Sequence, residues 1–266
     1  MTRSPAVMGI INITPDSFFP GGRSDSTATA IATGRQFFDG GADIVDVGGE
    51  STRPGAEPVS ESDELARVLP IVTALAQLGP VSIDTQKEAV ARAAVAAGAT
   101  VINDVSATLV ELAGELGVGY VGMHRQGDSR TMQDNPHYDD VVSEVASAMR
   151  AIALRARAVN VPQLWLDPGI GFGKTAEHNL ELLSHLDVFR ALCDELQCGL
   201  FIGTSRKRFL GTLAPDFLDV DDRLEGSIAT EAWSILYGAD VIRVHDVAVA
   251  VQLRELLTMP TAEVVA

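Results

Sequence analysis

The sequence predicts an α/β fold, a single (β/α)8 barrel of the TIM type with its active site at the carboxyl ends of the strands. Short runs of β-branched residues alternate along the chain with segments of helical period. Three of these runs share one local pattern, a glycine and an alanine before the apolar residues: "GGADIVDVGGES" (40–51), "GATVINDVS" (98–106) and "GADVIRVHDV" (238–247). The length of 266 residues is close to that of a barrel, which typically needs about 250.

Each glycine of this pattern suits the left-handed end of a helix, and each Val/Ile run suits a strand buried on both faces. Five further strands are expected at "AVMGIINI" (6–13), "VSIDT" (81–85), "YVGMH" (120–124), "LWLDPG" (164–169) and "LFIGTS" (200–205). Helical period predicts helices between them, at 61–77, 87–98, 139–159, 176–193 and 223–238. With no linker or low-complexity stretch, we expect one domain over residues 1–266.

A doubly wound open sheet is the structural alternative. Such a sheet usually has a glycine-rich nucleotide turn after its first strand, and "INITPDSF" contains no glycine. The barrel therefore remains the favoured fold.

Composition excludes several classes of partner. The formal charge of −16 argues against binding to nucleic acid or to an anionic membrane surface, which both need clustered Lys and Arg. No apolar run approaches the roughly 18 residues of a membrane helix, and the N-terminal residues lack the apolar core of a signal peptide. Cys193 and Cys198 are too few for a disulfide framework and suit a reducing compartment. We expect a cytoplasmic protein that binds small molecules.

Polar residues end all eight predicted strands. In a barrel these ends meet in one ring, which makes the set a predicted site, although a single buried carboxylate is more often structural. The members are Asn12, Asp46, Asp84, Asn103 with Asp104, Met123 with His124, Asp167, Ser205 with Lys207, and Arg243 with His245.

The ring divides into two chemical parts. Arg243 and His245 are two residues apart on one strand, so their side chains project to the same side, and Lys207 follows the seventh strand. Barrels often bind phosphate around strands seven and eight, where these cations lie. The other part, Asp84, Asn103 and Asp167, offers the acceptors and donors that the edge of a flat heterocycle needs. The ring therefore predicts a heterocyclic substrate that carries phosphate.

The stretch "DPGIGFGKT" (167–175) resembles a nucleotide-binding loop but matches neither fingerprint. Pro168 stands where a P-loop needs its first glycine, and Lys174 stands at the third glycine position of the dinucleotide motif. The glycines are instead expected to let the backbone come close to the bound heterocycle. Whether Lys174 belongs to the site or only supports the loop stays open.

Eight motifs, in order across nearly the whole chain, resemble those of the dihydropteroate synthases, members of the pterin-binding enzyme family. They are "MGIINITPDSF", "DVGGESTRPGA", "SIDT", "INDVS", "MHRQGDSRTMQDNPHYDDV", "DPGIGFGKT", "GTSRKRFLG" and "RVHDV". The resemblance implies a transferase of folate biosynthesis and a sulfonamide target. Its reaction is a Mg²⁺-assisted condensation of 6-hydroxymethyl-7,8-dihydropterin diphosphate with 4-aminobenzoate, which yields 7,8-dihydropteroate and diphosphate. It also suggests a homodimer built on the last helices.

The resemblance also implies a role for each matching residue. The pterin would be bound by Asp84, Asn103, Met123, Asp167, Phe172, Gly203 and Lys207. Diphosphate would be bound by Asn12, Arg243 and His245, with Asn12 nearest the Mg²⁺. Aminobenzoate would be bound by Phe18, Thr52, Arg53, Pro54 and Ser205, and a helix beginning near Ser205 would add its dipole. Catalysis would rest on Asp84, Lys207, Arg243 and His245.

Three alternatives remain open from the sequence. A non-catalytic paralogue would keep the fold and lose loop residues, and the first loop does depart from the family pattern, with Phe19 and Pro20 where the family has Ser and Asp. A pterin-dependent methyltransferase could share Asp84, Asn103 and Asp167 but has less need of "STRPGA" and "SRKRF". An unrelated phosphate-binding barrel enzyme has no reason to carry the whole motif series.

Overall fold

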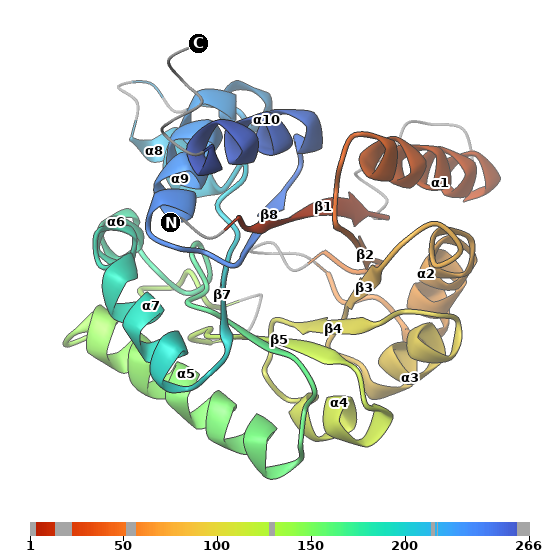
Figure 1. Ribbon diagram of the computed structural model, residues 1–266, viewed down its shortest axis with the longest axis horizontal. Coiled ribbons are helices and arrows are strands. Elements are labelled where there is room, and N and C mark those ends of the chain that lie inside the picture. The colour runs from red at the N-terminus through yellow and green to blue at the C-terminus, as the bar shows by residue number, and fades with distance from the viewer. Residues whose placement is uncertain are drawn as a thin grey trace.

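Eight parallel strands form a closed barrel in the computed structural model, each paired with the next along the chain and β8 paired with β1 (Figure 1). The structure describes residues 4–13, 23–51, 57–127, 131–213, 216 and 218–259. The strands are β1 (Ala6–Asn12), β2 (Ile44–Gly48), β3 (Val81–Asp84), β4 (Val101–Asp104), β5 (Gly119–Met123), β6 (Leu164–Asp167), β7 (Gly199–Ile202) and β8 (Val241–Val244). The predicted fold class is confirmed.

Helices surround the barrel, at least one after each strand (Figure 1). They are α1 (Arg23–Asp39), α2 (Glu61–Leu75), α3 (Glu88–Ala96), α4 (Val110–Leu116), α5 (Val141–Ala158), α6 (Ala176–Ser184), α7 (Leu186–Glu195), α8 (Arg208–Thr212), α9 (Leu224–Leu236) and α10 (Val247–Thr258), with a 3₁₀ turn at Val220–Asp222. In the described part of the chain, no helix combines the length and the apolar character that a membrane crossing needs.

Capping residues set several helix boundaries. The hydroxyl of Ser60 accepts a hydrogen bond from the backbone N–H of Asp63, and the carboxylate of Asp140 accepts one from Ser143. Each supplies a partner for an N–H that the first helical turn leaves free. Three predicted αβ glycines, at 41, 98 and 238, adopt φ of +93°, +112° and +82°. The expected left-handed helix ends are therefore confirmed.

One predicted helix is wrong: residues 176–193 form two helices, α6 and α7, which meet at His185. The side chains of Ser184 and His185 both lie within 3 Å of the backbone carbonyl oxygen of Glu181. They compete there with the helical N–H that would normally bond to this carbonyl, and such local hydrogen bonds favour a break. Apolar spacing alone carries no sign of this competition.

The inside of the barrel is layered, and the layering sets the position of the site. An apolar layer is formed by Met8, Ile44, Val101, Val121, Trp165, Phe201 and Val241. Successive side chains of a strand point to opposite faces, so a residue two positions further along lies directly above. Those positions hold Asp46 above Ile44, Asn103 above Val101, Asp167 above Trp165 and Arg243 above Val241. The predicted polar ring is therefore the next layer of the barrel interior.

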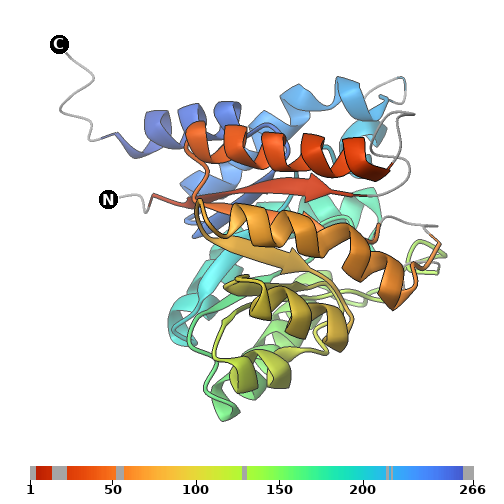
Figure 2. The same ribbon diagram turned by 90° about the vertical axis from the view of Figure 1, so that its right-hand side faces the viewer.

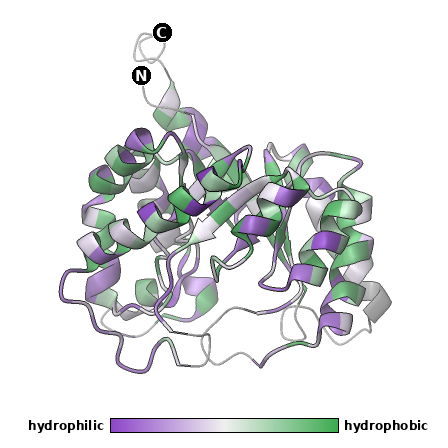
Figure 3. Cartoon of the chain, turned by 90° about the horizontal axis from the view of Figure 1, so that it is seen from below, coloured by the Kyte–Doolittle hydropathy of each residue, from purple (hydrophilic) through white to green (hydrophobic). Residues whose placement is uncertain are grey.

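The two ends of the barrel differ. Figure 2 shows the start of β1 and the end of α10 at one end, while the arrow of β1 points toward the other, where the polar layer lies. Around the barrel, Figure 3 shows hydrophilic and hydrophobic residues alternating along the helices, as expected for helices that pack one face on a sheet. The larger apolar cluster, which includes Ile71, Leu75 and Phe189, fills the space between strands and helices.

Candidate functional site

A guanidinium between two carboxylates forms the floor of the site. Arg243 donates from Nε to Asp46 Oδ2 at 2.6 Å and from Nη2 to Asp84 Oδ2 at 2.9 Å. Asn103 donates from Nδ2 to the same oxygen of Asp46 at 3.0 Å. Strand register places these residues side by side, because Asp84 of β3 pairs with Gly48 of β2 on one side and with Asn103 of β4 on the other.

Two carboxylate oxygens in the floor of the site have no donor among the described residues. Asp46 Oδ1 and Asp84 Oδ1 are buried and accept no hydrogen bond from the described residues. A buried carboxylate oxygen without a donor is costly, which makes it a binding group when a ligand brings N–H donors. Burial raises the pKa of Asp84 to about 7, against the opposing attraction of Arg243.

Asp167 forms a second acceptor at the end of β6. Its Oδ1 accepts from the backbone N–H of Gly169 at 2.7 Å, and none of the described residues donates to its Oδ2. Burial raises the pKa of this carboxyl, while the hydrogen bond from Gly169 and the charges of Lys207 and Lys174 oppose the rise. Asp167 therefore offers one free oxygen to a ligand.

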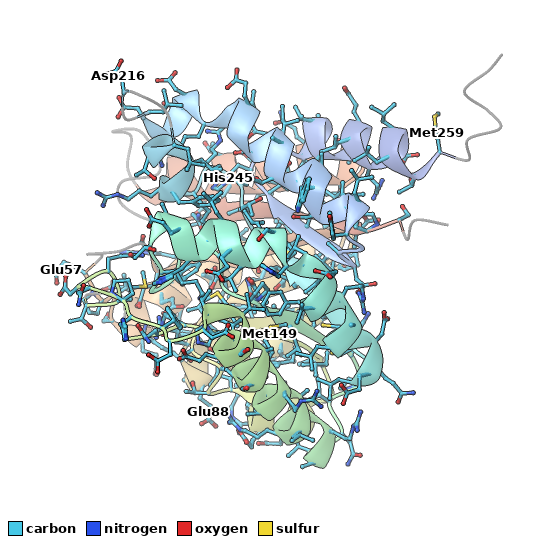
Figure 4. All side chains as sticks on the ribbon, turned by 90° about the vertical axis from the view of Figure 1, so that its left-hand side faces the viewer. Glu57, Glu88, Met149, Asp216, His245 and Met259 are labelled. Atoms are coloured by element: carbon cyan, nitrogen blue, oxygen red, sulfur yellow. The ribbon has the colours of Figure 1, made fainter. Side chains whose placement is uncertain are left out.

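A cavity of about 810 Å³ opens above the floor. One wall is aromatic and cationic, because Lys207 Nζ lies 3.9 Å from the centre of the Phe172 ring. At another point Ser205 Oγ accepts from the backbone N–H of His245 at 3.2 Å and lies 3.2 Å from its Nδ1. Figure 4 shows His245 inside the ribbon, between the end that carries Glu57 and the end that carries Met259.

The structure brings most of the predicted residues together. Among them, the cavity is lined by Asn12, Asp84, Phe172, Ser205, Lys207, Arg243 and His245. Three further predicted residues are buried at the same level of the barrel but do not line the cavity: Asn103, Met123 and Asp167. Gly203 lies at the end of β7 with the Cβ of Arg243 as its nearest side-chain neighbour. Phe18, Pro20, Thr52, Arg53 and Pro54 lie outside the described residues.

Two expectations need correction. Asp104 is not a member of the ring: it accepts from Tyr120 Oη at 2.9 Å and from the backbone N–H groups of Thr108 and Leu109. It is adjacent to Asn103 in sequence, so its side chain points to the opposite face of the strand. The helix expected near Ser205 begins at Arg208 and has five residues, because the chain first makes a turn with Arg206 at φ +55°.

The glycines of "DPGIGFGKT" do allow a close approach, and the partner is another loop of this chain. A Cβ on Gly169 would lie 1.9 Å from the carbonyl oxygen of His124, and one on Gly173 would lie 2.3 Å from that of Gln126. Both residues also have positive φ. The loop after β6 is therefore pressed onto the loop after β5, which only glycine permits.

Two buried ionisable groups beside the site were not assigned a role from the sequence. Lys174 is 3% exposed and Glu231 is 4% exposed. Burial lowers the pKa of Lys174 to about 7 and raises that of Glu231, which contacts Ser205, to about 8. For Lys174 the sequence did offer a signal, because it follows a run with glycine at every second position, 169, 171 and 173. For Glu231, on α9, the sequence offered none.

A magnesium ion can be tested against the donors present. The described part of the chain has no cluster of three or more His, Cys, Asp or Glu side chains arranged to hold a metal. Mg²⁺ commonly keeps several waters and binds through few protein groups together with substrate phosphates. A Cβ added to Gly48 would stand 3.2 Å from Asn12 Oδ1 and 3.6 Å from Asp84 Oδ2, so the two side chains are near neighbours. One amide oxygen, that of Asn12, fits a metal whose other ligands are water and a diphosphate.

Comparison with known proteins shows the same family over most of the chain. The family described as "Pterin binding enzyme" matches residues 8–245. The dihydropteroate synthase of Escherichia coli (strain K12) is 42% identical over 256 residues, which cover 93% of this chain and 89% of the relative. The enzyme of the same name from Bacillus subtilis (strain 168) is 39% identical over 260 residues, 94% of this chain and 87% of the relative.

Solved structures show the same similarity in three dimensions. The dihydropteroate synthase of Yersinia pestis, in a sulfonamide drug complex, is 38% identical with a TM-score of 0.87, over 96% of this chain and 93% of the other. That of Xanthomonas albilineans, with 4-aminobenzoic acid, is 41% identical with a TM-score of 0.86, over 96% of this chain and 94% of the other.

Proposed function

The chain belongs to the pterin-binding enzyme family, and on that premise we propose that it is a dihydropteroate synthase, a transferase of folate biosynthesis. It joins 6-hydroxymethyl-7,8-dihydropterin diphosphate to 4-aminobenzoate and releases diphosphate. The observation that carries this assignment is the floor of the cavity, where Arg243 bridges two buried carboxylates whose second oxygens stay free. Such a floor suits a flat heterocycle rich in N–H groups with an anionic group above it.

The pterin ring would lie between the carboxylates and the aromatic wall. Asp84 and Asp167 each offer a free oxygen to ring N–H groups, and the side-chain amide of Asn103 completes the polar edge. Phe172 and Lys207 pack as a unit that can cover one face of the ring. Met123 and Gly203, at the ends of β5 and β7, border the same region.

The diphosphate would lie toward β8. Arg243 uses Nε and Nη2 on the floor, and Nη1 has no acceptor among the described residues. His245 lies two residues further on, at the cavity wall, with Asn12 on the neighbouring strand β1. Asn12 would hold a Mg²⁺ ion, which would neutralise charge on the bound diphosphate.

Catalysis then rests on electrostatics and positioning. The bond between the methylene carbon and the diphosphate oxygen breaks, and its electron pair leaves with the diphosphate. The resulting cation is delocalised over the electron-rich dihydropterin. Arg243 and His245 stabilise the charge that develops on the leaving group. The aromatic amine is largely neutral near pH 7, so its nitrogen attacks the carbon without a strong general base. The new ammonium nitrogen then loses its proton to water. Holding both reactants in contact supplies much of the remaining rate enhancement.

For aminobenzoate, the described part of the site contributes Ser205. Its hydroxyl is fixed from two sides, by His245 and by Glu231, at the cavity wall. We assign the rest of the aminobenzoate site to Phe18, Thr52, Arg53 and Pro54 on the strength of the family motif.

The division of the site into two ends is tested with His245→Ala. This variant should bind a bare pterin as the wild type does and bind the pterin diphosphate about tenfold more weakly, because only the diphosphate contact is lost. Titration calorimetry with both ligands measures the two affinities. Equal losses for both ligands would show that His245 does not belong to a separate diphosphate end.

We further propose that the protein is a cytoplasmic homodimer, paired through its last helices. Large apolar side chains are exposed there: Trp233 and Leu236 on α9 are 42% and 53% exposed, and Leu256 on α10 is 67% exposed. Exposed apolar side chains grouped in this way are typical of an interaction surface. Sedimentation equilibrium should give twice the chain mass, and Leu236→Glu with Leu256→Glu should halve it. A wild-type monomer at micromolar concentration would rule out the dimer.

A further inference from the structure

Lys174 is a nearly buried lysine whose three donors are all engaged. It lies in the loop between β6 and α6, and its Nζ donates to the carbonyl oxygens of Gly169 at 2.9 Å and Phe172 at 3.1 Å. The third partner is His124 Nδ1, at 3.0 Å. Burial and the charge of Lys174 lower the pKa of His124 to about 3, so its ring is neutral and Nδ1 can accept. An ammonium group has three donors, so Lys174 has none left for a ligand.

The hydrogen bonds of Lys174 hold the backbone next to two residues of the proposed pterin site, Asp167 and Phe172. Gly169 is held at its carbonyl by Lys174, while its N–H donates to Asp167 Oδ1 at 2.7 Å. The same glycine is pressed against the carbonyl oxygen of His124. On the other side, the Phe172 carbonyl is held by Lys174 while the Phe172 ring faces Lys207.

We propose that Lys174 is a positioning residue for pterin binding: by fastening Gly169, Phe172 and His124 to one another, it fixes the free oxygen of Asp167 and the ring of Phe172 at the spacing of a pterin. The proposal rests on the function proposed above. Lys174 borders the cavity, but its three donors are engaged by the protein, so in this proposal it acts through the loop and not by a hydrogen bond to a substrate.

The charges around Lys174 come from several elements. Asp167 on β6 attracts its charge, and Lys207 after β7 repels it. Tyr138 presents its ring at 6.0 Å from Nζ, His178 of α6 lies edge-on to that ring, and His124 is the neutral acceptor. Burial outweighs the attraction of Asp167 and lowers the pKa of Lys174 to about 7. Above that pH the amine keeps only two donors, and its contact with His124 persists only if the ring changes to the tautomer that donates from Nδ1.

Three variants test the proposal, with 6-hydroxymethylpterin as the calorimetric probe. Lys174→Met removes the donors and should weaken pterin binding roughly tenfold, because the hydrogen bonds that hold the loop are lost. The KM for the pterin diphosphate should rise with it, and the KM for aminobenzoate should stay within about twofold. Lys174→Arg keeps a charge that does not titrate and should recover most of the affinity. Arg150→Met, which removes an exposed cation paired with Glu195 on the outer surface, is the matched control and should bind as the wild type does.

A second measurement uses the unaltered protein and so does not depend on a variant that folds. Wild-type affinity for the pterin should fall as the pH rises above about 7, after correction for the titration of the free pterin, which absorbance gives separately. In Lys174→Arg this decline should be absent. The proposal is overturned if wild-type affinity stays flat above that pH, or if a folded Lys174→Met binds the pterin normally. Failure of the wild type itself to bind a pterin would instead overturn the proposed function.

Discussion

Replacing Arg243 by methionine should both destabilise the protein and abolish turnover. The variant leaves two carboxylates facing each other without a cation, Asp46 fully buried and Asp84 6% exposed. Removing one partner of a buried ion pair typically costs about 3–5 kcal/mol of unfolding free energy. The loss should shrink at acidic pH, because Asp84, whose pKa burial raises to about 7, can then take up a proton and end the repulsion. Urea unfolding at two pH values measures the effect.

The control for this experiment is Arg150→Met on α5. Arg150 pairs with Glu195 at 2.6 Å, and the two side chains are 44% and 59% exposed. Ion pairs at the surface contribute about 0–1 kcal/mol, so this variant should unfold nearly as the wild type does. Similar unfolding curves for Arg243→Met and the wild type would show that Arg243 does not hold the floor together.

Asp84→Asn should lower the affinity for a pterin about 100-fold while the protein stays folded. The change keeps the shape of the side chain but replaces an anionic acceptor, and hydrogen bonds to charged groups contribute about 1.5–3 kcal/mol each. Arg243 keeps Asp46 as its partner, so the fold should tolerate the change. Calorimetry with a pterin, together with a thermal unfolding curve, separates binding from stability.

The same residue predicts how pterin binding depends on pH. Burial raises the pKa of Asp84 to about 7, so below that pH the carboxyl group of the free protein carries a proton. A ligand that donates to Asp84 must displace this proton. Wild-type affinity should therefore fall about tenfold for each pH unit below 7. In Asp84→Asn this slope should become shallower, with Asp167 as the remaining buried acceptor, and parallel slopes in the two proteins would assign the proton to another group.

Most of the fold could be predicted from the sequence because the barrel repeats one local rule. Buried apolar runs mark the strands, left-handed glycines end the helices before β2, β4, β5 and β8, and parallel strands bring their carboxyl ends together. The polar ring follows from that rule. The roles of its members do not follow. Asp46 and Asp84 look alike in sequence, yet Asp46 accepts from both Arg243 and Asn103, while Asp84 lines the cavity and, among the described residues, accepts from Arg243 alone.

Other features depended on contacts that sequence spacing does not record. The break at His185 comes from side chains that compete for one carbonyl, which apolar periodicity does not reveal. The role of Lys174 depends on a partner 50 residues away, His124. Asp104 is the exception, since its adjacency to Asn103 on a strand already required opposite faces.

Formation of product is the most direct test of the assigned reaction. The purified protein, incubated with 6-hydroxymethyl-7,8-dihydropterin diphosphate, 4-aminobenzoate and Mg²⁺, should release diphosphate and 7,8-dihydropteroate in equal amounts. Chromatography resolves dihydropteroate, and a coupled assay counts diphosphate. Omission of aminobenzoate should leave no dihydropteroate, and Arg243→Met should form none. A wild-type protein that binds the pterin diphosphate but yields no dihydropteroate would contradict the account and identify the chain as a pterin-binding protein without synthase activity.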